Sequence, residues 1–351
     1  MTFFLASVTS LAEAEIALAG GADIVDCKDP SRGALGALPL AEVAAIARAI
    51  GGRKPVSAVI GDLPMQPDVV LAEAQAMAAT GVDFVKVGLF AGEERAACIA
   101  ALAPLAARHK IIGVLFADAA PDLALLPLMA ASGFAGAMLD TAGKGTGRLL
   151  THMDMPALGV FVTACKAQGL MSGLAGSLEP PDVPRLLALA PDFLGFRGAL
   201  CKDRVRGGAL DPASIALVRA LIPLAGAVHA GPAPDGATDC IFVSDFTVPM
   251  RIGAYAFEHL APQNVRFNIE ADVLRLAAAG DSMPDVFSYD LIIDGIHLLA
   301  ATTAFSMVET LAERVAAQVL AHARVARVRV KVEKLDLGDF RVGVAIARGR
   351  V

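Results

Sequence analysis

The chain has 351 residues, which suits one large domain with a smaller one, or two of comparable size. Its formal net charge of −6 gives no electrostatic support to binding of nucleic acid, so no such partner is expected. Hydrophobic residues make up 56% of the sequence, but the uncharged run Leu123–Leu139 contains Pro127 and Gly133 and is too short to span a membrane, so no membrane partner is expected either.

The N-terminus indicates the cellular compartment, and the cysteine and histidine residues indicate whether a disulfide, metal or cofactor is expected. Residues Met1–Leu5 carry no basic leader, which predicts no signal peptide and a cytoplasmic protein. Five cysteines, with no C-x-x-C pair, indicate reduced thiols rather than a disulfide framework or a zinc site. None of the six histidines has ligand spacing with a nearby acid, so neither a metal nor a cofactor is expected.

Short apolar runs alternate with alanine-rich helical stretches over the first two thirds of the chain. Helical periodicity is clear at Leu11–Ala19, Leu40–Ile50 and Val69–Ala79 and is expected again at Pro212–Leu224. Eight runs read as strands, which are Phe3–Val8, Asp23–Cys27, Val56–Ile60, Phe84–Val87, Ile111–Phe116, Ala135–Leu139, Leu170–Gly173 and Phe193–Arg197. This α/β alternation predicts a (β/α)8 TIM barrel over residues 1–230. The rival is a doubly wound open sheet, but no G-x-G-x-x-G follows the first run.

A segment rich in proline and glycine, residues 231–238, predicts a linker, and the pattern changes after it. The remaining residues, 239–351, show two alternating runs, two helical segments and two more alternating runs. They are Cys240–Gly253, Val265–Leu274, Tyr289–Thr302, Phe305–Ala323, Ala326–Glu333 and Arg341–Ala347. The order ββααββ predicts a smaller α+β domain with helices over one side of a sheet.

Polar residues follow several of the eight strand runs, and two of them are lysines. Lys28 and Lys86 stand at the C-terminal ends of their runs, which is where barrel enzymes build active sites. The other charged residues at strand ends are Asp26, Asp62, Asp118, Asp140 and Arg197, with Lys144 in a glycine-rich loop. A lysine held among apolar neighbours can lose its proton and attack a carbonyl to form an imine, with a second lysine or an aspartate moving protons.

The last two strand ends predict a phosphate site. Gly176 and Ser177 follow the seventh run, and Arg197 and Gly198 close the eighth, in the loops that usually bind phosphate in this fold. Small residues let backbone N–H groups reach an anion, and an arginine adds charge-assisted bonds. Any single lysine here is more often a solvated charge, Asp62 and Asp118 could cap the next helices, and the residue types do not decide which lysine forms the imine.

Residues 1–210 resemble (5-formylfuran-3-yl)methyl phosphate synthase, a TIM barrel. The stretches that carry the resemblance are Gly20–Pro30, Gly33–Gly36, Ser57–Asp62, Val85–Leu89, Met138–Ala142, Leu174–Ser177 and Arg197–Cys201. The resemblance implies that two molecules of glyceraldehyde 3-phosphate are condensed and dehydrated to a furan phosphate of the methanofuran pathway. It implies that Lys28 forms the imine and Lys86 is the principal acid and base, while Asp26, Asp140 and Lys144 assist proton transfer and water loss.

The C-terminal region resembles dihydroneopterin aldolase, whose fold is the tunnelling fold. The resemblance rests on Ile252–Glu258, Ser288–Tyr289, Phe305–Glu313 and Val328–Lys334. It implies that Glu309 anchors a pterin, that Lys334, Tyr289 and Glu258 do acid–base work without a metal or an imine, and that the chain forms a homo-oligomer with sites between subunits. Leu335 follows Lys334 where the family usually has proline, so the loop after Lys334 is expected to differ.

The leading interpretation is a bifunctional lyase with small-molecule substrates, glyceraldehyde 3-phosphate in the barrel and dihydroneopterin in the second domain. Three alternatives stay open. The first is a barrel lyase whose second domain is inactive and only oligomerises. The second is a Schiff-base aldolase for a different sugar phosphate, and the third is a non-catalytic module that binds a phosphorylated metabolite.

Overall fold

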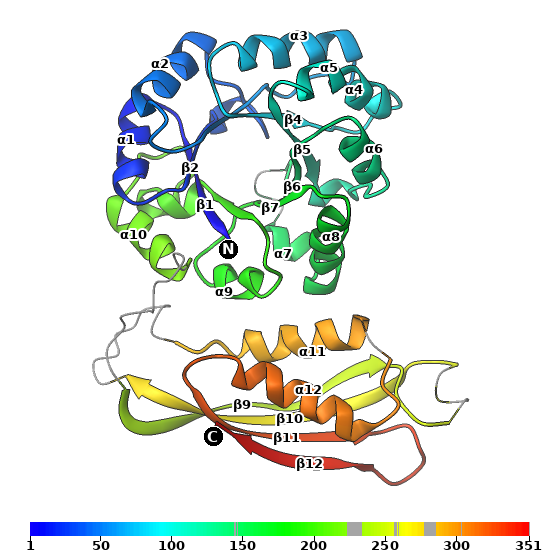
Figure 1. The fold of residues 1–351 in the computed structure, drawn as a ribbon. Coiled ribbons are helices and arrows are strands. Elements are labelled where there is room, and N and C mark those ends of the chain that lie inside the picture. The colour runs from blue at the N-terminus through cyan, green and yellow to red at the C-terminus, as the bar shows by residue number, and fades with distance from the viewer. Residues whose placement is uncertain are drawn as a thin grey trace. The chain divides into compact units, whose positions relative to one another are not determined.

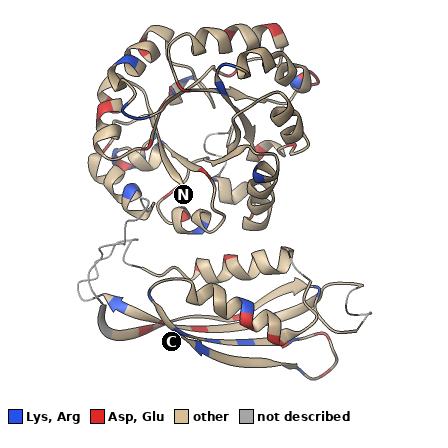
Figure 2. Cartoon of the chain, in the orientation of Figure 1, with Lys and Arg blue, Asp and Glu red and all other residues tan. Residues whose placement is uncertain are grey.

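The computed structural model of the chain describes residues 1–143, 145, 147–222, 234–255, 258, 260–276, 286–302 and 304–350. These residues fall into two compact units, Met1–Gly226 and Ala227–Val351, each with its own core. Figure 2 shows basic and acidic residues interspersed along both units. None of the described helices is long and apolar enough to cross a membrane.

The first unit is a closed barrel of eight parallel strands, as the sequence predicts (Figure 1). The strands are β1 (Phe3–Val8), β2 (Ile24–Cys27), β3 (Val56–Val59), β4 (Phe84–Gly88), β5 (Lys110–Phe116), β6 (Gly136–Asp140), β7 (Met171–Leu174) and β8 (Phe193–Phe196). Each strand pairs with the next one in the sequence, and β1 pairs with β8 to close the ring. A doubly wound open sheet is therefore wrong for this chain.

Helices surround the ring of strands (Figure 1). The α-helices are α1 (Leu11–Ala19), α2 (Leu40–Ile50), α3 (Pro67–Ala78), α4 (Arg95–Ala101), α5 (Ala103–Ala106), α6 (Leu125–Ala131), α7 (Leu149–His152), α8 (Met155–Ala167), α9 (Asp182–Leu187) and α10 (Pro212–Leu221). Short 3-10 turns follow several strands, at Pro30–Arg32, Ala117–Ala119, Gly198–Leu200 and Lys202–Arg204. Helix α10 ends at Leu221, before the predicted end at Leu224, because Ile222 leaves the helical conformation with φ −103° and ψ 103°.

The inside of the barrel is apolar at one level and polar at the next. Large apolar side chains from several strands fill the lower level, including Leu5, Ile24, Phe84, Ile112 and Phe193. Because side chains of a strand alternate between its two faces, the residues two positions further along β1, β2 and β4 also point inward. Those residues are Ser7, Asp26 and Lys86, all buried. The apolar level therefore forms a floor beneath the charged groups.

The second unit is a four-stranded antiparallel sheet with two helices, which confirms the predicted order ββααββ. Its elements are β9 (Pro234–Met250), β10 (Gln263–Leu276), α11 (Asp290–Thr302), α12 (Val308–Leu320), β11 (Val325–Lys334) and β12 (Val342–Gly349). The strand order across the sheet is β12-β11-β10-β9. Figure 1 shows both helices on the same face of this sheet.

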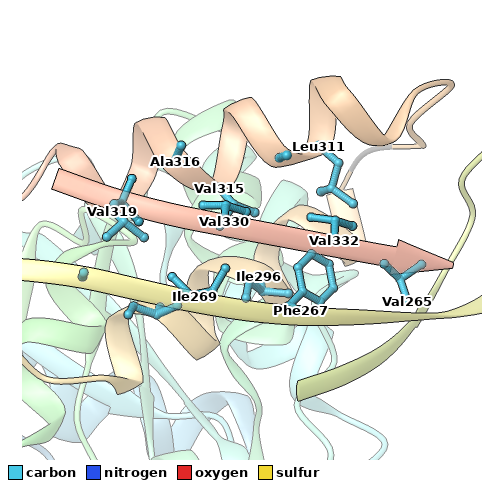
Figure 3. Close-up of a cluster of buried hydrophobic side chains, with 14 of the residues drawn as sticks. Val265, Phe267, Ile269, Ile296, Leu311, Val315, Ala316, Val319, Val330 and Val332 are labelled. Atoms are coloured by element: carbon cyan, nitrogen blue, oxygen red, sulfur yellow. The ribbon is translucent and has the colours of Figure 1, made fainter. Parts of the chain in front are cut away.

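The core of the second unit lies between that face and the helices. Strand β10 buries every second residue, and Phe267 and Ile269 belong to the same cluster as Val330 and Val332 of β11. Helix α12 contributes Leu311, Val315 and Val319, spaced four residues apart so that they share one side of the helix (Figure 3). The alternate residues of the strands and the residues on one side of the helix thus pack together in one apolar layer.

Strand β9 starts inside the segment expected to be a linker. Thr238 pairs with Leu274, and Pro234 lies opposite Leu276 at the end of the ladder. Proline is accepted here because it occupies the first position of the strand. The expected linker, residues 231–238, therefore loses its last five residues to the sheet, and residues 231–233 lie outside the described part of the chain.

Candidate active site

Two buried lysine–aspartate pairs lie together at the C-terminal ends of the barrel strands. Lys28 Nζ lies 2.9 Å from Asp140 Oδ2, and Lys86 Nζ lies 2.7 Å from Asp26 Oδ1. All four side chains are buried, and Lys86 is only 2% exposed. The sequence placed these residues at the ends of β2, β4 and β6, and the barrel brings them to one cavity, which they line.

Two serines that the sequence analysis did not select complete the surroundings of Asp26. The Ser7 hydroxyl donates to Asp26 Oδ2 at 2.9 Å, and the Ser57 hydroxyl donates to Asp26 Oδ1 at 2.6 Å. Ser7, Asp26 and Ser57 are register partners on β1, β2 and β3, so their side chains share one face of the sheet. The sequence feature that could have revealed these two serines is a hydroxyl side chain within an otherwise apolar strand. These bonds fix the orientation of the Asp26 carboxylate.

The two lysines are coupled electrostatically. Burial lowers the pKa of Lys86 from its usual value of 10.5, the Asp26 carboxylate acts to raise it, and the nearby Lys28 ammonium lowers it further. The net direction is downward, because the loss of water contacts outweighs the bound carboxylate. An amine of this kind can exchange protons at a pH where an exposed lysine stays charged.

Two other aspartates at strand ends hold loops rather than cap helices. Asp62 accepts bonds from the backbone N–H groups of Ala34 and Leu35, both at 2.7 Å, in the loop after β2. Asp118 accepts from Ala142 and Gly143 at 2.8 and 2.6 Å, in the loop after β6. Helix capping is therefore the wrong interpretation, because each carboxylate ties a neighbouring loop to its own strand end.

The loop after β7 has two successive residues with positive φ at the cavity. Gly176 has φ +116°, and the next residue, Ser177, has φ +51°, which is unfavourable for a residue with a side chain. A Cβ at position 176 would lie 2.9 Å from a methyl carbon of Thr141, so only glycine fits. Both residues line the cavity together with Gly198 of the next loop.

Arg197 lines the cavity, but protein atoms occupy its hydrogen-bonding capacity. Its guanidinium donates to both carboxylate oxygens of Glu13, at 2.5 and 3.2 Å. The remaining N–H groups donate to the backbone carbonyls of Ser7, Arg206 and Gly208, at 3.2, 3.1 and 2.9 Å. A guanidinium has five N–H groups, and all five are used. Arg197 therefore joins β1, α1 and the segment after β8, and leaves no donor for a phosphate.

The cavity has a volume of about 210 Å³. Its lining includes three arginines besides Arg197: Arg148, Arg204 and Arg206. No sequence signal separated Arg204 and Arg206 from an ordinary solvated loop, since they belong to a run of mixed charges. Lys144, predicted to assist catalysis, lies outside the described residues.

Cys27 lies between the catalytic candidates in sequence but not in space. It alternates with Asp26 and Lys28 along β2, so its side chain points to the other face of the strand. The thiol is fully buried, and burial, reinforced by the Asp26 charge, raises its pKa to about 12. Cys27 is therefore a packing residue beneath the surrounding helices.

The second unit holds a buried pair of its own. Lys334 Nζ at the end of β11 lies 2.6 Å from Glu258 Oε1, and both side chains are buried. Glu258 also accepts a bond from the Tyr255 N–H at 3.1 Å. The hydrogen bond from Lys334 lowers the pKa of Glu258. Gly253, with φ +145°, faces this carboxylate so closely that a Cβ there would lie 2.0 Å from its carboxyl carbon.

The other two residues predicted for this site do not join the pair within one chain. Tyr289 is 58% exposed, and Glu309 is exposed in the first turn of α12. Leu335, which stands where proline was expected, donates its N–H to the Asn264 carbonyl at 3.0 Å and extends the β10–β11 ladder. Proline could not make that bond, because it has no N–H.

No group of three or more histidine, cysteine, aspartate and glutamate side chains suited to a metal ion occurs among the residues that the structure describes. The charged groups of both sites are instead paired lysines and carboxylates.

Comparison with known proteins gives each unit a family. Residues 4–219 match the 4-HFC-P synthase family. The chain belongs to this family. Residues 241–347 match FolB, dihydroneopterin aldolase, so a FolB domain follows the synthase barrel.

Relatives of both parts are known. A Methylorubrum extorquens protein that carries the name (5-formylfuran-3-yl)methyl phosphate synthase provisionally is 46% identical, over 66% of this chain and 94% of its own length. A protein of that name from Methanopyrus kandleri is 36% identical, over 58% of this chain and 92% of its own length. A crystal structure of dihydroneopterin aldolase from Burkholderia, bound to guanine, shares 30% identity and covers 32% of this chain and 93% of its own, with a TM-score of 0.30.

Proposed function

We propose that the barrel condenses two molecules of glyceraldehyde 3-phosphate to (5-formylfuran-3-yl)methyl phosphate through an imine on Lys28. The observation that carries the proposal is the buried array of Lys28, Lys86, Asp26 and Asp140 above an apolar floor. Such an array suits imine chemistry, because one amine must act as nucleophile while another group moves protons. The family match supports a furan phosphate as the product.

Lys28 and Asp140 act at the first step. The ammonium of Lys28 passes a proton to Asp140, 2.9 Å away, and the neutral amine adds to the aldehyde carbon of the first triose phosphate. Asp140 returns the proton to the carbinolamine hydroxyl, which leaves as water, and the protonated imine remains. This iminium withdraws electrons and acidifies the C–H bond on the neighbouring carbon.

Lys86 then removes that proton in the proposed sequence. Burial holds the pKa of Lys86 below its ordinary value, so its neutral form is accessible as a base, and Asp26 orients the amine from 2.7 Å. The resulting enamine carbon attacks the aldehyde of the second triose phosphate. Attack of a hydroxyl of the second triose on the imine carbon closes the ring, and aromatisation then expels the Lys28 amine. Over the whole sequence, counting the water lost in imine formation, one inorganic phosphate and two water molecules are released net, which balances the atoms of two substrates against one furan phosphate. Lys144 is assigned a role in water loss on the resemblance alone.

For the second unit we propose aldol cleavage of dihydroneopterin with release of glycolaldehyde. The buried Glu258–Lys334 pair supports this, because a lysine and a carboxylate in contact can exchange the proton of the substrate hydroxyl. Tyr289 and Glu309 are exposed in a single chain, and we propose that a homo-oligomer brings them to the pair of a neighbouring subunit. The size of the assembly in solution, read by light scattering, tests that part: a monomeric chain that cleaves dihydroneopterin contradicts it.

Trapping of the imine tests the barrel proposal. The full-length protein is incubated with glyceraldehyde 3-phosphate and sodium borohydride, and the modified peptide is located by mass spectrometry. We expect one reduced adduct on Lys28, absent from Lys28→Ala and still formed, more slowly, in Lys86→Gln. An adduct on Lys86 instead would exchange the two roles. If no lysine carries an adduct, the imine proposal is wrong, and the alternative that remains is a barrel that binds a phosphorylated metabolite without imine chemistry.

A further inference from the structure

The segment Lys202–Gly208 after β8 is held in a strained conformation over the cavity. Asp203 and Arg204 both have left-handed backbone angles, with φ +55° and +56°, although neither is glycine. Such residues cost free energy and persist where the surroundings impose them, which occurs most often at functional sites. Arg197 ties this segment down, because its guanidinium binds the carbonyls of Arg206 and Gly208 while Glu13 fixes its other side.

In this arrangement Arg206 lines the cavity, and its side chain forms no hydrogen bond or ion pair with the residues that the structure describes. Arg206 lines the cavity and is half-buried, and its Nε is buried with no acceptor among the described residues. Burial lowers the pKa of Arg206, and the Asp140 carboxylate partly offsets this effect. A guanidinium N–H removed from water and left without an acceptor is costly, so the pairing of this guanidinium within the chain is incomplete.

Two other arginines of the cavity, Arg148 and Arg197, differ in this respect. Arg148 donates to Glu179 at 2.7 Å and to Asp182 at 3.2 Å, so two carboxylates balance its charge. Arg197 is balanced by Glu13. Among the described residues no carboxylate forms an ion pair with Arg206, and Asp140, whose charge acts on it from further away, already pairs with Lys28.

The cavity as a whole is positive although the chain is acidic. Among its described lining residues six side chains are basic and three are acidic, while the chain carries a net charge of −6. A local excess of positive charge in a partly enclosed site favours an anion. The proposed reaction brings two phosphates into the cavity, so two anionic groups need partners there.

We propose that Arg206 binds the second substrate phosphate, and that Arg197 is the positioning residue that holds it there. The inference rests on the proposed use of a phosphorylated triose by the barrel. A guanidinium fork matches two oxygens of a phosphate and supplies directional, charge-assisted bonds. The sequence analysis gave this role to Arg197, whose donors are all occupied by protein.

The test compares phosphorylated and unphosphorylated aldehydes in the full-length protein. Arg206→Gln is measured beside Lys202→Gln, which removes the same charge from the same segment but from a residue that does not line the cavity. For Arg206→Gln we expect a KM for glyceraldehyde 3-phosphate raised by roughly 10- to 100-fold, the range of a lost bond between charged groups. Borohydride trapping of unphosphorylated glyceraldehyde on Lys28 should stay within about twofold of wild type. Lys202→Gln should match wild type in both assays, apart from a screened surface effect.

Two outcomes would overturn the assignment. Equal losses with both aldehydes would mean that Arg206 acts on Asp140 rather than on phosphate. An unchanged KM for the phosphorylated aldehyde would mean that Arg206 contacts no phosphate. If Arg206→Gln does not fold, Arg206→Lys keeps the charge but loses the fork, and we then expect an intermediate increase in KM with the same selectivity for the phosphorylated aldehyde.

Binding of inorganic phosphate separates this inference from the proposed chemistry, because it needs no imine. In calorimetry with the wild-type protein we expect phosphate to bind, with affinity reduced roughly tenfold or more in Arg206→Gln and unchanged in Lys202→Gln. That result would support the site even if no imine formed on Lys28. Imine formation together with equal phosphate affinity in wild type and Arg206→Gln would leave the chemistry in place and reject Arg206 as its phosphate ligand.

Discussion

The two units of this chain assemble charged groups in opposite ways. In the barrel, side chains from β1, β2, β3, β4 and β6 meet within one chain, because parallel strands all end at the same rim. In the second unit, neighbouring strands are antiparallel and end at opposite edges, and of the four residues predicted for its site Glu258 and Lys334 meet within one chain. A closed parallel barrel can complete a polar site alone, whereas a small antiparallel sheet gathers fewer strand ends at any one place.

The largest expected effect separates the two sites. Lys28→Ala should lower furan phosphate formation by roughly a thousandfold or more, because the residue that forms the covalent bond is lost. The same preparation should cleave dihydroneopterin at the wild-type rate. Product analysis with both substrates in one sample measures this. Lys334→Ala is the matched control and should give the reverse pattern. If either variant loses both activities, the two sites are not independent.

The next effect concerns the stability of the second unit. Glu258→Gln leaves Lys334 buried without its counter-charge, so we expect the free energy of unfolding to fall by about 3 kcal/mol. The chain has no tryptophan, and both of its tyrosines, Tyr255 and Tyr289, belong to this unit, so tyrosine fluorescence in denaturant follows its unfolding. Glu309→Gln, at an exposed position, should change the value by less than about 0.5 kcal/mol. Equal effects of the two variants would contradict a buried pair.

A smaller loss is expected at Gly253. Gly253→Ala adds a Cβ that would lie 2.0 Å from the Glu258 carboxyl carbon, at a backbone angle of φ +145°. We expect a loss of about 2 kcal/mol and displacement of Glu258 from Lys334. Gly338→Ala is the matched control, since Gly338 also has a positive φ of +131° but only ordinary contact with Phe340. The same tyrosine signal measures both. A loss no larger than that of Gly338→Ala would mean that the close approach to Glu258 is relieved without cost.

The subtlest expected effect is a shift of the pH profile of the barrel. The neutral form of Lys86 is the proposed base, and its pKa is lowered, so kcat/KM should rise with pH through an apparent pKa below 10.5. Asp26 acts to raise the pKa of Lys86, so Asp26→Asn should move this limb to still lower pH. Asp62→Asn, which removes a carboxylate that binds only the loop after β2, should leave the limb in place. A shift to higher pH in Asp26→Asn would contradict the proposed base.

The sequence was sufficient for the fold and for the lysine–aspartate array because both follow from local rules. Strand periodicity placed Asp26, Lys28, Lys86 and Asp140 at strand ends, and closure of the ring brought them together. The second unit followed equally well from alternation in the strands and helical spacing between them.

Contacts between distant parts of the chain were beyond such rules. Arg197 was predicted to bind phosphate from its place at a strand end. Its partner Glu13 lies 184 positions away in the sequence, and no sequence pattern predicts that pair. Asp62 and Asp118 looked like helix caps because their neighbours in sequence allow it, yet they bind neighbouring loops. Ser7 and Ser57 contact Asp26 because the register of β1, β2 and β3 aligns the three residues, and the sequence alone does not give that register.

The pleat of β2 also decides which nucleophile an aldehyde can meet. Thiolates add to aldehydes faster than amines do and would hold a triose as a hemithioacetal, an unproductive reservoir. Cys27 stands between Asp26 and Lys28 in the sequence, but the strand turns its sulfur to the outer face, where burial keeps it protonated with a pKa of about 12. The barrel is thereby chemoselective, because the Lys28 amine lines the cavity and the Cys27 thiol does not.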